Sequence, residues 1–425
     1  MPISTIEFLT AREILDSRGR PTVYATCGLS SGAIASVSVP SGASTGQAES
    51  CELRDGDPKR YRGLGCRQAV ANVNGEIAGA MVGSSFESQA AFDQTLIHLD
   101  GTPNKARLGS NAVLAASLAF ARALARERRV PLHIYFASLL GQEHQALPRL
   151  TINLLSGGKH AGGQVAIQDV LIVPVSSNTI DESLVMAFDV YQAAAALVER
   201  RYGMRLLTAD EGGLAPPCES VEAMIQTAVG AIESAGYRPG ADVALAIDIA
   251  ASHFYSDGHY HLDGLALSSE EMIARVRDWV TRFPLVSVED ALAEDDWEHW
   301  PKLREAIEKK ARVVGDDLLC TNPARISRAI DTNSCNTLLL KVNQVGTVSE
   351  ALTALQMARS AGWQAIASAR SGETEDNWLA DLAVGWSADQ IKVGSITQSE
   401  RLAKYNRLLA IEAESAWPVV PFRTI

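Results

Sequence analysis

Apolar and polar positions follow one pattern in the first third of the chain and another in the remainder. Two short β-prone runs, residues 23–29 and 33–39, flank a Ser-Ser-Gly turn, which is typical of an antiparallel hairpin. Three alanine-rich stretches with helical spacing of apolar positions follow: residues 69–82, 87–99 and 110–126. Strands followed by helices predict a small α+β domain over residues 1–140.

From about residue 141 to the end, short apolar runs alternate with amphipathic helical stretches, which predicts an α/β fold with a parallel sheet closed into a βα (TIM-like) barrel. Six of these runs end in an ionisable residue, and the six lie 22 to 41 residues apart: Asp248, Glu289, Asp316, Lys341, Arg370 and Lys392. The carboxyl ends of barrel strands open on one face. We therefore expect the six side chains to converge on one mouth.

Three of the six residues form an all-oxygen ligand set. Asp248, Glu289 and Asp316 suit a hard cation such as Mg²⁺, and the absence of His or Cys among them disfavours zinc. Lys341 and Lys392 follow apolar runs, so we expect desolvation to lower the pKa of at least one and leave it neutral, as a general base requires. The alternative is that both lysines simply pair with the metal-site acids.

A second acidic group lies upstream. Glu211 stands at a Gly-Gly turn, and Asp169 is predicted to end an apolar strand. Two neighbouring carboxyl groups raise the pKa of one of them, which could then act as a general acid on a leaving hydroxyl. A base on one side and an acid on the other is the arrangement that a β-elimination requires.

Two glycine-rich segments complete the set of candidate features. Residues 41–46 lack the Gly-Lys-Ser/Thr of an NTP-binding loop and are interpreted as a mobile lid. Residues 157–163 carry His160, for which a binding role is favoured over an exposed loop position. Arg370 and Ser371 place a guanidinium beside a hydroxyl, a suitable phosphate clamp.

Composition excludes several classes of protein. The 425 residues carry 50 acidic and 38 basic side chains, a formal charge of −12, which disfavours nucleic-acid binding. No apolar stretch is long enough for a bilayer span, and the first residues lack the order of a signal peptide, so we expect a soluble, cytoplasmic protein. The six cysteines show no metal-binding or disulfide spacing and are expected to be free thiols.

Several longer motifs extend the picture: DSRGRPTV (16–23), VPSGASTG (39–46), ELRDGD (52–57), LGSNAVLAASLA (108–119), ADEGGLAP (209–216), SVEDALAEDDW (287–297), VGDDLLCTNP (314–323), LLLKVNQVGT (338–347), RSGETED (370–376) and SERLAKYN (399–406). Together they closely resemble enolase (phosphopyruvate hydratase) over about residues 3–412. The resemblance implies a barrel with an N-terminal α+β domain, two Mg²⁺ ions, and a homodimer or larger homo-oligomer.

The resemblance also implies a role for each candidate residue. Asp248, Glu289 and Asp316 would hold the tighter Mg²⁺, and Ser44 would reach a second ion shared with the substrate phosphate. Lys341 would be the base at C2 of 2-phosphoglycerate, and Glu211 the acid near the C3 hydroxyl, assisted by Asp169. The remaining groups would bind the substrate. Lys392 would bind its carboxylate, and Arg370 and Ser371 would bind its phosphate. His160 would belong to a loop that closes on the substrate.

Three positions depart from the family pattern. Ala369 stands where enolases have a histidine, Asp169 where they have a glutamate, and Gly163 where they usually have an asparagine. Metal ligands and base are intact while the dehydration side is altered. This favours a specialised paralogue resembling carboxyphosphonoenolpyruvate synthase, which takes a second, phosphonate substrate; the alternatives are an ordinary glycolytic enolase and a non-catalytic binding protein.

Overall fold

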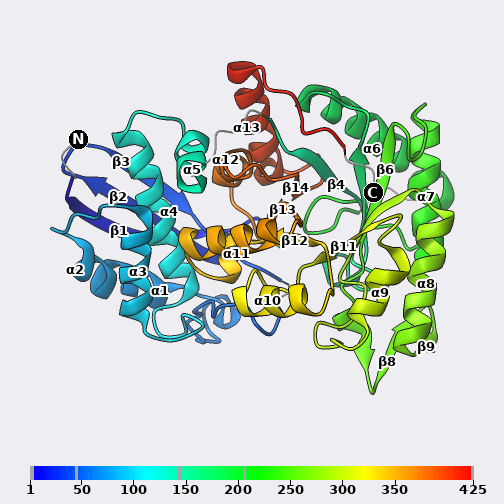
Figure 1. Ribbon diagram of the computed structural model, residues 1–425, viewed down its shortest axis with the longest axis horizontal. Coiled ribbons are helices and arrows are strands. Elements are labelled where there is room, and N and C mark those ends of the chain that lie inside the picture. Colours follow the sequence, from blue (N-terminus) through cyan, green and yellow to red (C-terminus); the bar gives the residue numbers. More distant parts are fainter. Residues whose placement is uncertain (1–3, 44–45, 142–145, 204–206, 423–425) are drawn as a thin grey trace.

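A computed structural model describes residues 4–43, 46–141, 146–203 and 207–422. Its smaller part, blue to cyan in Figure 1, begins with an antiparallel sheet of order β1-β2-β3: β1 (Ile6–Leu15), β2 (Pro21–Leu29) and β3 (Ile34–Ser38). The predicted hairpin is confirmed, since β2 pairs with β3 antiparallel through Cys27 and Ala35.

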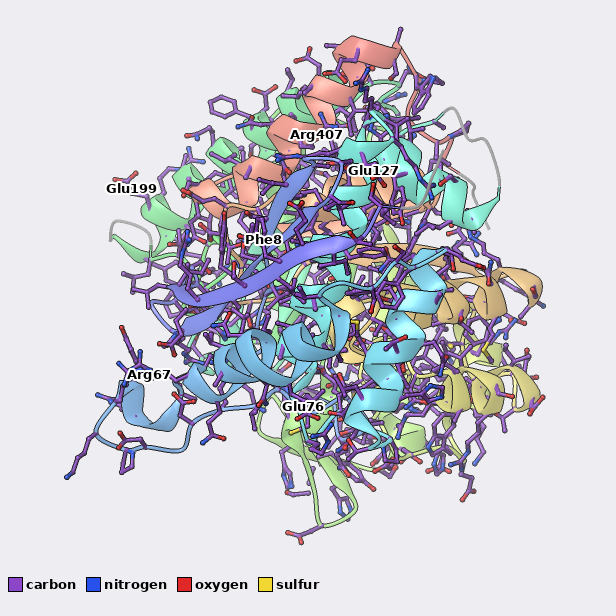
Figure 2. The ribbon with its side chains drawn as sticks, turned by 90° about the vertical axis from the view of Figure 1, so that its left-hand side faces the viewer. Phe8, Arg67, Glu76, Glu127, Glu199 and Arg407 are labelled. Atoms are coloured by element: carbon purple, nitrogen blue, oxygen red, sulfur yellow. The ribbon has the colours of Figure 1, made fainter. Side chains whose placement is uncertain are left out.

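The helical elements of this part are η1 (Tyr61–Gly63), α1 (Arg67–Asn72), the π-helical turn η2 (Val73–Ile77), α2 (Ala78–Met81), α3 (Gln89–Asp100), α4 (Ser110–Glu127) and α5 (Leu132–Leu140). The segments α1, η2 and α2 pack on β1, and α4 packs on β2 and β3. Alanine at nearly half of the buried positions of α4 lets this helix pack closely on β2 and β3. Phe92 of α3 stacks on Phe120 of α4 with ring centroids 4.2 Å apart. Figure 2 views this side of the molecule, with Phe8 on β1 and Glu127 at the end of α4.

The larger part is a closed eight-stranded barrel, green to red in Figure 1, with ring order β10-β11-β12-β13-β14-β4-β5-β6. Its strands are β4 (Arg149–Ser156), β5 (Asp169–Pro174), β6 (Val243–Asp248), β10 (Leu285–Glu289), β11 (Arg312–Gly315), β12 (Thr337–Leu340), β13 (Gln364–Ser368) and β14 (Gln390–Gly394). The predicted α/β barrel beside a smaller α+β domain is thereby confirmed.

Helices surround the barrel: α6 (Ile180–Tyr202), α7 (Val221–Ser234), α8 (Ser269–Arg282), α9 (Trp300–Ile307), α10 (Pro323–Asp331), α11 (Val348–Ser360), α12 (Trp378–Gly385) and α13 (Ser399–Ser415). Short 3₁₀ turns η3 (Gly158–His160), η4 (Ala251–Phe254) and η5 (Val342–Gln344) follow strands at the rim. A small sheet, β7 (Tyr255–Ser256), β8 (His259–Leu262) and β9 (Leu265–Leu267), lies outside the barrel.

The expected uniform alternation of parallel strand and helix is wrong at one place. The strand β5 follows β4 with no α-helix between them and runs antiparallel to both β4 and β6. Asp169 therefore begins a strand instead of ending one, and it pairs with Ser156 and Asp248, the last residues of β4 and β6. Because β5 runs in the opposite direction, its first residue lies at the rim where its neighbours end.

Buried polar contacts join the two parts of the chain. Asp93 of α3 accepts hydrogen bonds from the backbone N–H and hydroxyl of Ser349 in α11, at 2.9 and 2.6 Å. Arg122 of α4 pairs with Asp376 at 2.5 Å. The barrel mouth and the N-terminal domain are thus held in register by contacts outside the mouth itself.

Candidate active site

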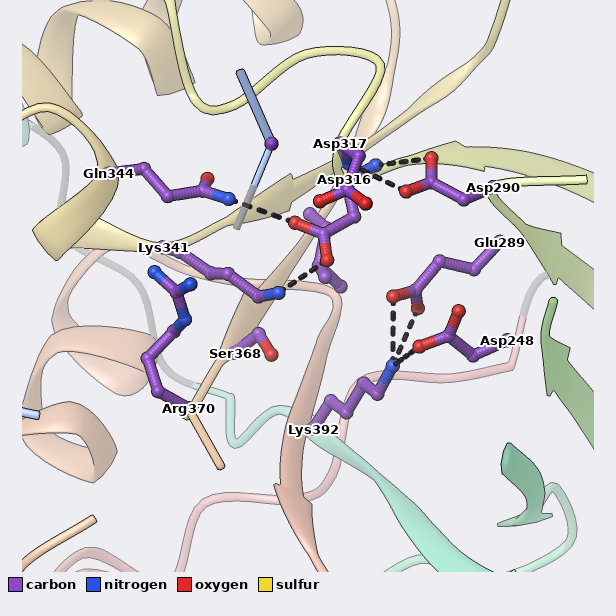
Figure 3. Close-up of polar contacts among 12 residues, drawn as sticks. Asp248, Glu289, Asp290, Asp316, Asp317, Lys341, Gln344, Ser368, Arg370 and Lys392 are labelled. Atoms are coloured by element: carbon purple, nitrogen blue, oxygen red, sulfur yellow. Dashed lines mark hydrogen bonds and ion pairs between the residues drawn. The ribbon is translucent and has the colours of Figure 1, made fainter. Parts of the chain in front are cut away.

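The mouth of the barrel brings together the six ionisable residues that the strand pattern singled out. Asp248 and Glu289 end β6 and β10, whereas Asp316 and Lys341 directly follow β11 and β12. Lys392 is the third residue of β14, so it lies within the strand and not at its end. Figure 3 shows that its side chain nevertheless points into the same mouth.

Each lysine is paired with carboxylates. The Lys392 ammonium donates to Asp248 at 2.8 Å and to both oxygens of Glu289 at 2.9 Å. Lys341 forms a short ion pair with Asp316, whose other oxygen accepts 3.0 Å from the Gln344 amide. The lysine contacts are among the dashed lines of Figure 3, and they correspond to the alternative in which the lysines pair with the acids.

The expectation of a lysine with a lowered pKa is wrong for this arrangement. Burial alone lowers the pKa of Lys392, but Asp248 and Glu289 outweigh it and raise that pKa well above its ordinary value. For Lys341, burial likewise lowers the pKa, but Asp316 together with Glu289 outweighs it, and the pKa is raised. Both lysines are therefore cationic at neutral pH while these carboxylates face them.

The acids of the mouth suit a divalent cation. Asp248, Glu289 and Asp316 are all buried and offer only oxygen atoms. Burial, and then the charge of Asp248, raise the pKa of Glu289 well above its ordinary value, a sign of excess negative charge that a bound cation would neutralise.

Among the described residues, two groups hold three ligand atoms within 4.8 Å of one another: Asp290 with Asp316 and Asp317, and His160 with Asp169 and Glu211. Of the three predicted metal ligands Asp248, Glu289 and Asp316, only Asp316 belongs to one of these two described groups. The carboxylate of Asp290 accepts from the backbone N–H groups of Asp316 and Asp317, at 3.0 and 2.6 Å. It therefore fixes the loop that carries Asp316.

On another side of the mouth, His160 lies between the two upstream carboxylates. Its Nδ1 is 3.2 Å from Asp169 Oδ2, and its Nε2 is 3.9 Å from Glu211 Oε1. Burial lowers the pKa of His160, but Glu211 and Asp169 raise it to about 9. The imidazole is therefore protonated at neutral pH and shared by two acids.

The pKa values of Asp169 and Glu211 are shifted in opposite directions, as expected if one of the two is a general acid. The raised pKa belongs to Asp169, however, and not to Glu211, the acid that the resemblance implied. Burial raises the pKa of Asp169, despite His160. For Glu211, burial raises the pKa, but His160 together with Arg401 and the two mouth lysines outweighs burial and lowers it. Asp169 is also fixed by the Ser156 hydroxyl at 2.5 Å, and Glu211 by the Asn153 amide at 3.0 Å.

The phosphate-clamp residues are adjacent and already engaged. Arg370 donates to Glu49 at 3.0 Å and to Asn343 Oδ1 at 2.9 Å. The Ser371 hydroxyl accepts from the backbone N–H of Ala43 at 2.8 Å and from Arg18 at 3.2 Å. Ser44, the predicted ligand of a second ion, lies outside the described residues.

Amide side chains at the mouth escaped sequence reasoning. Gln168 donates to Asp248 at 3.0 Å, and Asn153, Asn343 and Gln344 contact Glu211, Arg370 and Asp316 as described above. Three of these amides lie within three residues of a predicted site residue, and Asn153 is a polar residue inside the buried run of β4. Nearness to a predicted site residue, and a polar residue within a buried strand, were the two features of the sequence that could have indicated these amides.

Ala369 lies in the wall of the pocket that these residues enclose. It is buried, its backbone N–H donates to the Lys392 carbonyl at 2.8 Å, and it lines a small space of about 20 Å³ together with His160, Glu211, Lys341, Ser371 and Lys392. Ala369 contributes only a methyl group to this wall, where the family pattern has the larger imidazole of a histidine.

Fold and site together define a two-domain barrel protein with acids and bases gathered at the carboxyl-end mouth. Comparison with protein-family models gives two matches, the N-terminal domain of enolase over residues 6–136 and the C-terminal TIM barrel domain of enolase over residues 144–419. The chain belongs to the enolase family. Within the described part of the chain, no helix has the length and apolar character needed to cross a membrane.

Proposed function

We propose that this chain is a Mg²⁺-dependent lyase of the enolase family that removes the C2 proton of 2-phosphoglycerate or a close analogue and eliminates water. One observation carries the proposal: a candidate base and a candidate acid group face each other across one pocket. Lys341 follows β12, and Asp169 begins β5; these strands are four apart in either direction around the eight-stranded ring. His160, Glu211 and Lys341 line the pocket between them.

The residues of the chain can divide the elimination between them. Lys341 takes the C2 proton, and the electrons of that C–H bond form the C2–C3 double bond as the C3–oxygen bond breaks. A proton from the Asp169–His160–Glu211 group reaches the leaving oxygen, which departs as water. Asp248, Glu289 and Asp316 would hold Mg²⁺, which when bound would supply positive charge to stabilise the negative charge that develops on the substrate carboxylate.

Binding residues account for the two anionic ends of such a substrate. Arg370 and Ser371 offer a guanidinium and a hydroxyl to a phosphate, and Lys392 offers an ammonium to a carboxylate. Because Lys341 is cationic beside Asp316, it acts as a base only after losing its proton. We therefore expect its pKa to fall when Asp316 is neutralised by a cation.

Within the family, we infer a specialised paralogue that resembles carboxyphosphonoenolpyruvate synthase and takes a second, phosphonate substrate. Two observations favour this over an ordinary enolase: Ala369 offers only a methyl group to the pocket wall in place of an imidazole, and the short Asp169 is held by Ser156 and His160. Misplacing a catalytic group by about 1 Å can cost roughly a hundredfold in rate. Simple dehydration of 2-phosphoglycerate should therefore be slow.

The experiment that tests the function has two readouts on the full chain with Mg²⁺ and 2-phosphoglycerate. Exchange of the C2 proton with deuterated solvent, followed by NMR, tests proton removal; its absence would leave a non-catalytic binding protein. Formation of phosphoenolpyruvate tests dehydration. Exchange with slow product formation supports the paralogue, whereas turnover within the usual enzyme range of about 1 to 1,000 per second supports an ordinary enolase.

We also propose that the chain forms a homodimer or larger homo-oligomer. Large apolar side chains are exposed at the end of β1 and on α6 and α13: Leu15 at 54%, Val185 at 51%, Phe188 at 54% and Leu402 at 36%. Exposed apolar side chains of this size are typical of interfaces. Light scattering on the eluting protein measures the mass, and a mass of 45.5 kDa would contradict the proposal.

A further inference from the structure

A second cavity, of about 360 Å³, lies beside the active-site pocket on the side of the N-terminal domain. Arg370 lines the active-site pocket, and its guanidinium donates to Glu49 and Asn343, which both line the second cavity. A ligand in the second cavity would therefore lie next to one in the first.

Arg20 is the wall residue that gives this cavity its chemistry. Its backbone is fixed in the turn between β1 and β2, because its N–H donates to Asp16 Oδ1 at 2.9 Å and its carbonyl accepts from Asp16 N–H at 2.8 Å. Its side chain makes no hydrogen bond or ion pair with any residue in the described ranges. Arg18, from the same turn, is by contrast engaged with Asp16, Ser41 and Ser371.

Among the described charged residues that line the cavity, Arg20 is the one whose side chain has no ion-pair partner. Glu49 is paired with Arg370 at 3.0 Å. Glu52 forms a short ion pair with Arg54 and accepts from Ser41 Oγ at 3.1 Å. Each wall acid thus has its own cation, and the guanidinium of Arg20 is left to attract an anion.

A second donor lies in the same wall. The Oδ1 atom of Asn343 accepts from Arg370, which turns the amide so that its nitrogen remains to donate, and this nitrogen has no partner among the described residues. A guanidinium and an amide nitrogen are both donors without acceptor capacity, a combination that suits carboxylate or phosphonate oxygens. The volume of the cavity is within the range of small-molecule sites.

We propose that this cavity binds a small organic oxyanion carrying a phosphonate and a carboxylate, as the second ligand beside the acid in the active site. The assignment rests on the proposed function, in which a phosphonate is the second substrate. It makes Arg20 a binding residue for the second ligand and leaves the first to Lys392, Arg370 and Ser371. The two ligands should therefore respond to different substitutions.

Calorimetric titration of the full chain with phosphonoformate tests the assignment, with Mg²⁺ present and the active site saturated with 2-phosphoglycerate and its product. Arg20→Met should weaken phosphonoformate binding about tenfold or more, since it removes a charge-assisted donor. Arg12→Met is the matched control, because Arg12 lies on β1 over the ring of Tyr24 and does not line the cavity. It should leave the affinity within twofold.

Three outcomes would overturn the proposal. The first is equal phosphonoformate affinity in wild type and Arg20→Met. The second is displacement of phosphonoformate by 2-phosphoglycerate, which would assign it to the active site. The third is inorganic phosphate binding as tightly as phosphonoformate with the same dependence on Arg20, which would indicate a general phosphate site.

The C2-exchange assay separates this proposal from the proposed function. Arg20→Met should leave C2 exchange of 2-phosphoglycerate within twofold of wild type. If C2 exchange occurs but phosphonoformate binding does not depend on Arg20, the second site is refuted and the proposed function stands. If phosphonoformate binding depends on Arg20 but no C2 exchange occurs, the proposed reaction is refuted and the cavity remains a binding site for the oxyanion.

Discussion

Asp93 offers a quantitative test of how the two domains are held together. It is fully buried in α3, and among the described residues its carboxylate has four donors and no cation: Ser117 Oγ at 2.6 Å, Gln89 Nε2 at 2.9 Å, and the N–H and Oγ of Ser349 at 2.9 and 2.6 Å. Burial outweighs these hydrogen bonds and raises the pKa of Asp93 from 3.8 to about 6.

A raised pKa means that the folded protein takes up this proton before the unfolded chain does. The stabilisation from protonation is therefore fully present below pH 3.8 and is lost as the pH rises through about 6. One pKa unit corresponds to about 1.4 kcal/mol, so the whole effect is about 3 kcal/mol. Between pH 7 and pH 5 the folded state should gain about 1.3 kcal/mol from Asp93.

Urea unfolding at pH 5, 6 and 7 measures this gain as a difference between wild type and Asp93→Asn, because asparagine does not titrate and other groups cancel. Asp331→Asn, at an exposed position near the end of α10, is the control and should show a constant difference. The stability of wild type relative to Asp93→Asn should rise by about 1 kcal/mol from pH 7 to pH 5. An unchanged or falling difference would refute the reasoning.

Three further predictions concern the candidate site. Lys341→Ala should reduce C2 exchange of 2-phosphoglycerate by about a hundredfold or more, and the exposed Lys59→Ala should not; equal loss in both would remove the base assignment. Ala369→His combined with Asp169→Glu should increase phosphoenolpyruvate formation about tenfold or more, and unchanged turnover would count against the paralogue. Chelation of divalent cations should abolish exchange and added Mg²⁺ should restore it; exchange that persists after dialysis against chelator would contradict metal dependence.

Much of the architecture could be predicted from local pattern. The hairpin of β2 and β3 and the barrel strands follow from runs of apolar residues and the turns between them, because each strand buries its own side chains. The convergence of Asp248, Glu289 and Asp316 followed from one further rule, that barrel strands end on one face. These inferences need no knowledge of which strands are neighbours.

The electrostatic state of the lysines depends on that knowledge. Lys392 on β14 reaches across the barrel to Asp248 and Glu289, whose strands β6 and β10 are three and four places away around the ring. An apolar run before a lysine predicts only its desolvation, which lowers the pKa. The attraction of carboxylates from distant strands has the opposite sign and is larger here.

Asp169 shows how one reversed strand changes the chemistry of a mouth. In a barrel of parallel strands, an acid at the start of β5 would lie at the closed end, far from Lys341. Because β5 is antiparallel, Asp169 pairs with Asp248 at the open end, and Ser156 and His160 can fix its carboxylate. The apolar run around β5 reads the same in both directions, so the sequence pattern predicts a strand there without its direction. That direction, decided by the β4–β5 connection containing η3, is what brings His160 and Asp169 to the same side of the pocket.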